Sequence, residues 1–183
     1  MVVELTIAIP QASRAELFAQ LFEAEHSYVL HSLRRLGVAE RDLEDVTHDV
    51  FVVVHRKLPE YDASRPARPW LFAIAVRAAS DYRRRGRTRL EQVSDALDAH
   101  GAPGNTEHEL ERREQRALVI EALRGVEESR LPLFVMVDLD EVPVVDAAAA
   151  LSIPLNTAYS RLRLARADFA AAVARLRAAR GGR

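Results

Sequence analysis

The chain has 183 residues, 49% of them apolar, with a formal net charge of −1 and no cysteine. One medium domain or two small ones can therefore form a hydrophobic core, whereas disulfides and thiolate metal sites are excluded. No apolar run of about 18 residues could span a bilayer, and residues 1–10 lack a signal-peptide pattern, so we expect a soluble cytoplasmic protein without membrane insertion.

Helical periodicity dominates the chain, and no stretch alternates in the way that a strand does. The first predicted helix covers residues 13–36, with Leu17, Leu21 and Phe22 among the residues of its buried side. Gly37 is the expected end of this helix, because glycine favours the position just after a helix.

The second predicted helix covers residues 40–58, buries a stripe of valines and exposes several acids. Asp45, His48 and Asp49 lie outside the stripe at helical spacing, but no further ligand nearby supports a metal site. The acidic group indicates a docking surface for a basic partner, and a solvated helix face is the simpler alternative.

The third predicted helix begins near Pro69, after a proline-rich loop. Residues 65–89 contain eight arginines and one acid, interleaved with Trp70, Phe72 and Tyr82. Arginine binds a phosphate backbone and aromatic rings stack on unpaired bases, so this segment predicts a nucleic-acid contact. Trp70 by itself is expected to pack in the core, and a solvated helix end is the alternative for the arginines.

Residues 86–106 contain glycine and proline but little apolar periodicity, which is typical of a flexible linker. Further helices are predicted at residues 107–126, 131–139, 143–151 and 156–179. We therefore predict an all-α fold of two small helical domains joined by a flexible linker. The predicted parts are an N-terminal extension (1–12), a helical domain (13–88), a linker (89–106) and a second helical domain (107–183).

The last two predicted helices have the features of a helix-turn-helix. A short alanine-rich helix precedes a tight connection at residues 152–154, and Asn156 can cap the final helix. Small polar and arginine side chains gather near the start of this helix: Thr157, Ser160, Arg161, Arg163 and Arg166. Such a face suits entry into the major groove of DNA. Two packed amphipathic helices with a solvated arginine face are an equally simple interpretation.

Enzyme motifs are absent from the sequence, which has no glycine-rich phosphate loop, nucleophile elbow or metalloprotease His-Glu pair. Asp138, Asp140 and Glu141 cluster before a helix and are expected to be turn residues rather than an acid–base pair. We expect no catalysis, no cofactor and no metal.

Taken in order, these motifs resemble the extracytoplasmic-function group (group IV) of the sigma-70 family. The matching segments are Asp42–Phe51, Tyr61–Asp62, Pro69–Ala75, Asp81–Arg85 and Asp146–Leu162, continued by Ala165–Arg166. Each segment alone is a weak signal. Their order, spacing and coverage, from about Leu17 to Leu176, carry the resemblance.

The resemblance implies an alternative sigma factor that binds core RNA polymerase and promoter DNA, with an anti-sigma factor as a further partner. The implied polymerase-binding residues, from region 2, are Asp42, Asp45, His48 and Asp49. The implied minus-10 DNA residues are Arg65, Arg68, Trp70, Arg77, Arg83, Arg84 and Arg85. The implied minus-35 DNA residues, from a region 4-like helix-turn-helix, are Asn156, Thr157, Ser160, Arg161, Arg163 and Arg166.

Some residues depart from the family pattern. Arg77 stands where the family often has asparagine, and Asn156 stands where glycine is frequent in the turn. A stand-alone helix-turn-helix regulator is the main alternative, but it leaves Trp70 and the following arginines without a role. A helical adaptor that binds only protein would show no salt-dependent association with DNA.

Overall fold

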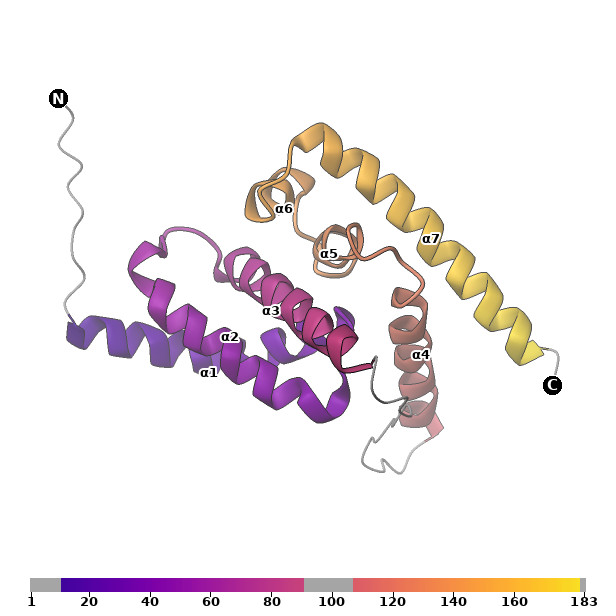
Figure 1. Cartoon of the computed structure of the whole chain (residues 1–183), viewed down its shortest axis with the longest axis horizontal. Coiled ribbons are helices and arrows are strands. Elements are labelled where there is room, and N and C mark those ends of the chain that lie inside the picture. Colours follow the sequence, from indigo (N-terminus) through magenta and orange to yellow (C-terminus); the bar gives the residue numbers. More distant parts are fainter. Residues whose placement is uncertain (1–10, 91–106, 182–183) are drawn as a thin grey trace.

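The computed structural model describes residues 11–90 and 107–181, in which all regular structure is helical (Figure 1). The α-helices are α1 (Gln11–Arg35), α2 (Leu43–Lys57), α3 (Ala67–Leu90), α4 (Glu107–Leu123), α5 (Leu131–Phe134), α6 (Val144–Ala150) and α7 (Leu155–Gly181). Two short 3₁₀-helices lie at Glu40–Asp42 (η1) and Leu58–Glu60 (η2), and a π-helical turn lies at Val135–Leu139 (η3). The predicted all-α class is confirmed. The predicted linker and N-terminal extension lie mostly outside the described residues.

α3 is longer than the sequence predicted at both ends, since it starts at Ala67 and continues through Gly86 to Leu90. The interpretation of Gly86 as the first linker residue is therefore wrong. Glycine inside a helix costs only about 1 kcal/mol relative to alanine, and the arginines around it are good helix formers. Propensity therefore allows the helix to continue.

The N-terminal half, α1 to α3 with η1 and η2, is a three-helix arrangement around a shared apolar core. Each helix contributes fully buried side chains, among them Val29 and Leu33 of α1, Val50 and Val54 of α2, and Leu71 and Phe72 of α3. Burying one such side chain contributes about 1.5–3 kcal/mol. The valine stripe predicted for the second helix is part of this core.

The end of α1 is fixed by Gly37, which has a φ of +88°. The Val38 amide donates to the carbonyl of Leu33 at 3.1 Å, and the Gly37 amide donates to Arg34 at 3.1 Å. This is the Schellman pattern, in which the residue after the helix takes the left-handed conformation that glycine adopts without strain. The turn redirects the chain into η1 and α2.

The C-terminal half, α4 to α7 with η3, packs through small side chains. Ala147 and Ala148 of α6 are buried, as are Ala158 and Ala165 of the adjoining α7. These short side chains let the last two helices approach closely. α4 and α7 also lie close together at Gly125, which follows α4. A Cβ added to this glycine would lie only 2.6 Å from the Cβ of Ala172 in α7.

In the turn between α6 and α7, the residue with the left-handed backbone conformation is not the one that the sequence analysis indicated. Ser152 has a φ of +56°, and the Ile153 amide donates to Ala148 at 3.0 Å. Ser152, and not Asn156, is therefore the left-handed residue of the turn. α7 begins at Leu155, so Asn156 lies in its first turn and does not cap it.

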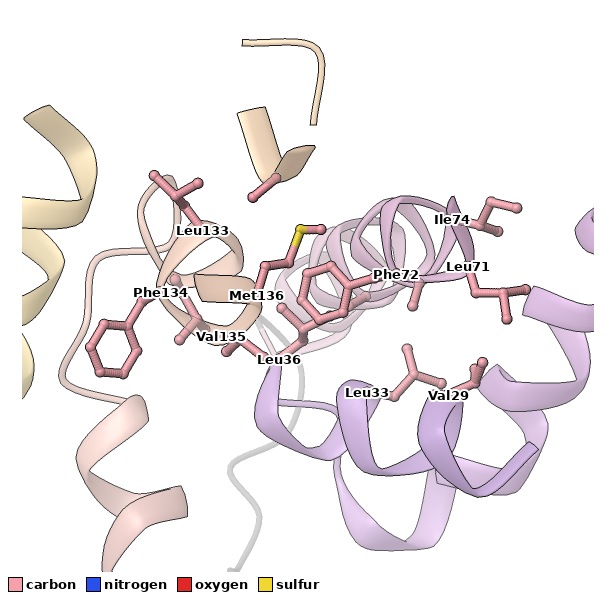
Figure 2. Close-up of a cluster of buried hydrophobic side chains, with 14 of the residues drawn as sticks. Val29, Leu33, Leu36, Leu71, Phe72, Ile74, Leu133, Phe134, Val135 and Met136 are labelled. Atoms are coloured by element: carbon pink, nitrogen blue, oxygen red, sulfur yellow. The ribbon is translucent and has the colours of Figure 1, made fainter. Parts of the chain in front are cut away.

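The two halves share one continuous hydrophobic cluster. Figure 2 shows Met136 beside Phe72 of α3, and Val135 beside Leu36 at the end of α1. Met136 and Val135 are both 0% exposed. In this structure the halves are thus packed against each other through their cores, and the division into two domains remains a prediction.

Candidate functional site

The acidic face of α2 is open to solvent. Asp45, His48 and Asp49 are exposed and lie within about one helical turn of one another. Asp42, the fourth predicted member, is half-buried and accepts a hydrogen bond of 2.7 Å from the hydroxyl of Tyr82. Burial raises the pKa of Tyr82, and the bond to Asp42 adds to the effect. Asp42 therefore holds α3 against the start of α2, while the other three residues face outwards.

An aromatic cluster on α1 borders this face, and the sequence interpretation missed it. Phe22 was expected to be buried, but it is 42% exposed. Its ring lies 4.8 Å from that of Phe51 in α2, and His26 lies 3.8 Å from the carboxylate of Glu44. Phe22 has the helical phase of the buried stripe, but periodicity does not reveal whether a partner helix covers that part of α1. The face thus combines acids with an apolar edge.

The loop between η2 and α3 is held by its own polar side chains. Asp62 accepts hydrogen bonds from the Ser64 amide at 3.0 Å and the Ser64 hydroxyl at 2.6 Å. These bonds keep the pKa of Asp62 below its usual value, with a smaller contribution from Arg65. The Tyr61 ring stacks on Trp70, with centroids 4.7 Å apart. Trp70 is only half-buried, so the loop brings a partly open aromatic stack to the start of α3.

The predicted minus-10 arginines differ in their surroundings. Arg65, Arg77, Arg84 and Arg85 are exposed on the loop and α3. Arg68 is tied to α1, because it pairs with Glu25 at 2.9 Å and its guanidinium lies 5.0 Å from the ring centroid of Tyr28.

The predicted minus-35 residues occupy two faces of α7. Asn156, Ser160, Arg163 and Arg166 are exposed, and Arg166 pairs with Asp138 at 2.8 Å. Thr157 and Arg161 lie on the flank of the buried side and are half-buried.

The start of α7 also exposes two apolar side chains that the prediction omitted. Tyr159 is 54% exposed and Leu155 is 40% exposed, one helical turn apart. Both have neighbours in the predicted set on the exposed face, such as Ser160. Leu155 precedes Leu162 by seven residues and therefore shares its helical phase, and Tyr159 lies at the edge of the same stripe, so periodicity alone did not predict that these two side chains are exposed.

One cleft between the halves brings a residue of each predicted DNA set together. Arg83 of α3 and Arg161 of α7 both line this cleft, whose volume is about 490 Å³. Arg83 pairs with Glu128 at 2.9 Å and also donates to the carbonyl of Leu36. The other arginines of the two sets do not line this cleft.

Neither a metal centre nor a membrane span is found in the part of the chain that the structure describes. No group of three or more histidine or acidic residues there could hold a metal ion. No helix within those residues is long and apolar enough to cross a membrane.

The family model for sigma-70 region 2 matches residues 21–89, which correspond to most of α1, α2 and α3. CnrH, an RNA polymerase sigma factor of Cupriavidus metallidurans, is 28% identical over 163 residues, covering 84% of this chain and 85% of the relative. NccH of Alcaligenes xylosoxydans xylosoxydans is 26% identical over 159 residues, with the same coverage. The sigma-E factor of Escherichia coli is 24% identical over 155 residues, covering 80% and 81%. The chain belongs to the extracytoplasmic-function group of the sigma-70 family.

Solved structures of sigma factors share the fold of this extracytoplasmic-function factor. CnrH in complex with the cytosolic domain of CnrY has a TM-score of 0.60 and 26% identity, covering 86% of this chain and 87% of that one. RpoE in complex with the anti-sigma factor NepR from Bartonella quintana has a TM-score of 0.66, 19% identity and coverages of 85% and 96%, which supports the fold alone. Since these likenesses extend over both halves, a stand-alone helix-turn-helix regulator is not favoured.

Proposed function

We propose that this sigma factor binds core RNA polymerase through the exposed face of α2 and directs it to particular promoters through α3 and α7. The observation that carries the proposal is the outward-facing group Asp45, His48 and Asp49, which lies inside the matched region 2. An acidic helical face beside the exposed ring of Phe22 suits a basic helix that also carries apolar side chains. Phe22 therefore extends the proposed polymerase surface beyond the residues predicted from sequence.

The minus-10 element is proposed to meet the loop after η2 and the exposed side of α3. The stacked Tyr61 and Trp70 offer an aromatic surface for an unpaired base, and exposed arginines such as Arg77 and Arg85 can follow the phosphates. Arg68 and Arg83 are engaged in ion pairs within the protein, so they are free for DNA only after those pairs break.

The minus-35 duplex is proposed to receive the first turns of α7. Asn156, Ser160 and Arg163 are exposed on one side of the helix, where their donors and acceptors suit base edges in a major groove. Tyr159 and Leu155 are exposed next to these residues at the start of α7, where their side chains can contact thymine methyl groups. We add both to the proposed set.

An anti-sigma factor is a further proposed partner, because CnrH and RpoE were both solved in complex with partner proteins, and that of RpoE is named an anti-sigma factor. Sigma factors are initiation factors, and we propose that this one has no catalytic activity of its own and works in the cytoplasm. The proposed parts are a polymerase and minus-10 domain (13–88) and a minus-35 domain (107–183).

The proposal is tested by co-elution of the purified protein with bacterial core RNA polymerase. The wild type is expected to bind, and the double variant Asp45→Arg, Asp49→Arg is expected to lose binding because two attractive contacts become repulsive. Circular dichroism of the variant should show an unchanged helical content, because both side chains are exposed.

The matched control reverses two exposed acids of α4, in the variant Glu114→Arg, Glu121→Arg. It makes the same change in net charge and is expected to bind polymerase like the wild type. Equal loss of binding in both variants would indicate a general charge effect and would remove the assignment of α2.

A further inference from the structure

A bidentate ion pair joins α7 to the π-helical turn η3. The Arg166 Nε donates to both carboxylate oxygens of Asp138, at 3.0 and 3.2 Å, and Nη2 donates to one of them at 2.8 Å. Such paired contacts fix the orientation of a guanidinium as well as its distance. The two residues are 28 positions apart in the sequence, so the fold, and not the spacing along one helix, brings them together.

Asp138 is the anchored member of this pair. It lies in η3, whose first two residues, Val135 and Met136, are fully buried. π-helical turns are rare and occur frequently at functional sites. The Asp138 side chain is 25% exposed, whereas that of Arg166 is 57% exposed. The carboxylate is thus held on the packed side of the contact, and the guanidinium reaches the solvent.

The pair leaves one edge of the Arg166 guanidinium open. Asp138 takes the N–H of Nε and one N–H of Nη2, so the N–H groups of Nη1 have no hydrogen-bond partner in the described part of the chain. Because more than half of the side chain is exposed, this edge can donate to a group outside the protein. Arg166 is therefore fixed in orientation and still available to a ligand.

Arg130, in the same half, shows the opposite state of a paired arginine. It is 26% exposed and pairs with Glu127 at 2.7 Å and with Asp168 at 2.8 Å, so acids engage it on two sides. Its donors are used within the protein, as is typical of a structural ion pair. Arg166 has one acidic partner among the described residues and is more exposed.

Arg166 lies on the flank of the proposed minus-35 face of α7. Asn156, Ser160 and Arg163 span about 60° of the helix circumference, and Arg166 lies about another 60° beyond Arg163. The major groove is about 12 Å wide, and a helix with its side chains is about 10–12 Å across. When the centre of the face meets base edges, its flank therefore lies against the phosphates of the groove wall.

We propose that Asp138 is a positioning residue that orients the Arg166 guanidinium for a hydrogen bond to a backbone phosphate of the minus-35 duplex. The proposal rests on the proposed function, because it requires α7 to enter the major groove there. An arginine that is ordered before the DNA arrives loses less rotamer freedom on binding. The Asp138 charge repels the phosphate, but salt screens such repulsion between groups at the surface.

The test is competition binding to promoter DNA by the full-length protein in complex with core RNA polymerase, repeated at several salt concentrations. Asp138→Ala is expected to weaken binding by about threefold to tenfold, the range for ordering one long side chain. Arg166→Ala is expected to weaken it by about tenfold and to reduce the salt dependence by about one phosphate contact.

The double variant Asp138→Ala, Arg166→Ala shows whether Asp138 acts through Arg166. It is expected to bind no more weakly than Arg166→Ala alone, because a positioning residue has no effect once the side chain that it orients is absent. A merely structural role would make the two losses additive. Asp138→Glu keeps a carboxylate and is expected to recover part of the affinity that Asp138→Ala loses.

The control variant is Glu121→Ala, which makes the same charge change and breaks an exposed pair with Arg124 in the same half. It is expected to bind the promoter like the wild type, and circular dichroism checks that every variant is folded. Tighter binding by Asp138→Ala than by the wild type would show that the carboxylate competes with the phosphate, and would overturn the proposal. Additive losses in the double variant would overturn it as well.

A promoter with a scrambled minus-35 element separates this proposal from the proposed function. If the wild-type complex does not prefer the intact element, the proposed function fails and this proposal fails with it. If the wild type prefers the intact element and Asp138→Ala binds it equally well, this proposal alone is overturned.

Discussion

Thr47 brings a hydroxyl group into the core of the N-terminal half. It is 1% exposed, and its Oγ1 has no hydrogen-bond partner among the described residues. Ser32, which is also buried, differs because its hydroxyl donates to the carbonyl of Tyr28 at 2.8 Å. A buried polar group without a partner costs about 1–3 kcal/mol. The Thr47 hydroxyl therefore destabilises the folded protein, whereas the hydrogen-bonded Ser32 hydroxyl stabilises it.

We predict that Thr47→Val raises the free energy of unfolding by about 1 kcal/mol, because a methyl group of similar size replaces the unpaired hydroxyl. Ser32→Ala is the comparison and is expected to lower the same quantity by about 1 kcal/mol. Urea unfolding followed by circular dichroism measures both. A loss of stability in Thr47→Val would mean that the hydroxyl has a partner in solution.

Arg163 is the exposed arginine in the middle of the proposed minus-35 face. We predict that Arg163→Ala lowers the preference for the cognate promoter by about 1–3 kcal/mol, the range for one good base contact, and leaves polymerase affinity unchanged. Competition binding of the polymerase complex to cognate and unrelated DNA measures this preference. Arg180→Ala, at the exposed far end of α7, is the control and should leave it unchanged. An equal loss on both DNAs would instead assign Arg163 to the phosphate backbone.

At the scale of elements, two glycines in or beside helices have opposite surroundings. Gly125 follows α4, and a Cβ there would lie 2.6 Å from Ala172 and 3.2 Å from the Ala122 carbonyl. Gly86 lies inside α3, and an added Cβ would meet nothing within 4 Å. The first glycine lets α4 and α7 approach each other, whereas the second only lowers the helix propensity of α3.

We predict that Gly125→Ala lowers the free energy of unfolding by about 1–3 kcal/mol, because the added methyl group overpacks the contact with α7. Gly86→Ala is expected to raise it by about 0.5–1 kcal/mol through helix propensity. Thermal unfolding of the two variants provides the comparison. Similar melting temperatures for both would contradict the close approach at Gly125.

At the scale of the molecule, the core passes from one half to the other without interruption. Met136 is fully buried against the N-terminal half, while Trp70, the single tryptophan of the chain, reports on that half. Because one buried cluster spans both halves, a cavity opened on one side of the interface also weakens the packing on the other side.

We predict that Met136→Ala destabilises the whole molecule by about 2–5 kcal/mol, the usual range for removing a buried methionine side chain. Unfolding followed by Trp70 fluorescence should shift as much as unfolding followed by circular dichroism. Val173→Ala, a half-buried position of α7, serves as the milder comparison. A shift seen by circular dichroism alone would show that the halves unfold independently.

Much of the fold and part of the candidate site follow from local patterns in the sequence. The valine stripe of α2, the glycine that ends α1 and the exposure of Asp45 and Asp49 depend on residues a few positions apart, and each is found in the structure. Order and spacing of the motifs also identified the sigma-70 family, which the comparisons confirm. The individual DNA-contact and polymerase-contact residues stay predictions.

Helical phase and capping are local properties, and the sequence by itself therefore determined the helices and the family of this protein. Contacts between residues distant in sequence decided the rest. Asp140 resembled a simple turn residue until the fold brought it against Tyr28 and Arg35. Arg83 pairs with Glu128 because the fold brings the two together, and Phe22 is exposed because the fold leaves part of α1 uncovered. Periodicity predicts the direction of a side chain, but it does not predict which partner lies there.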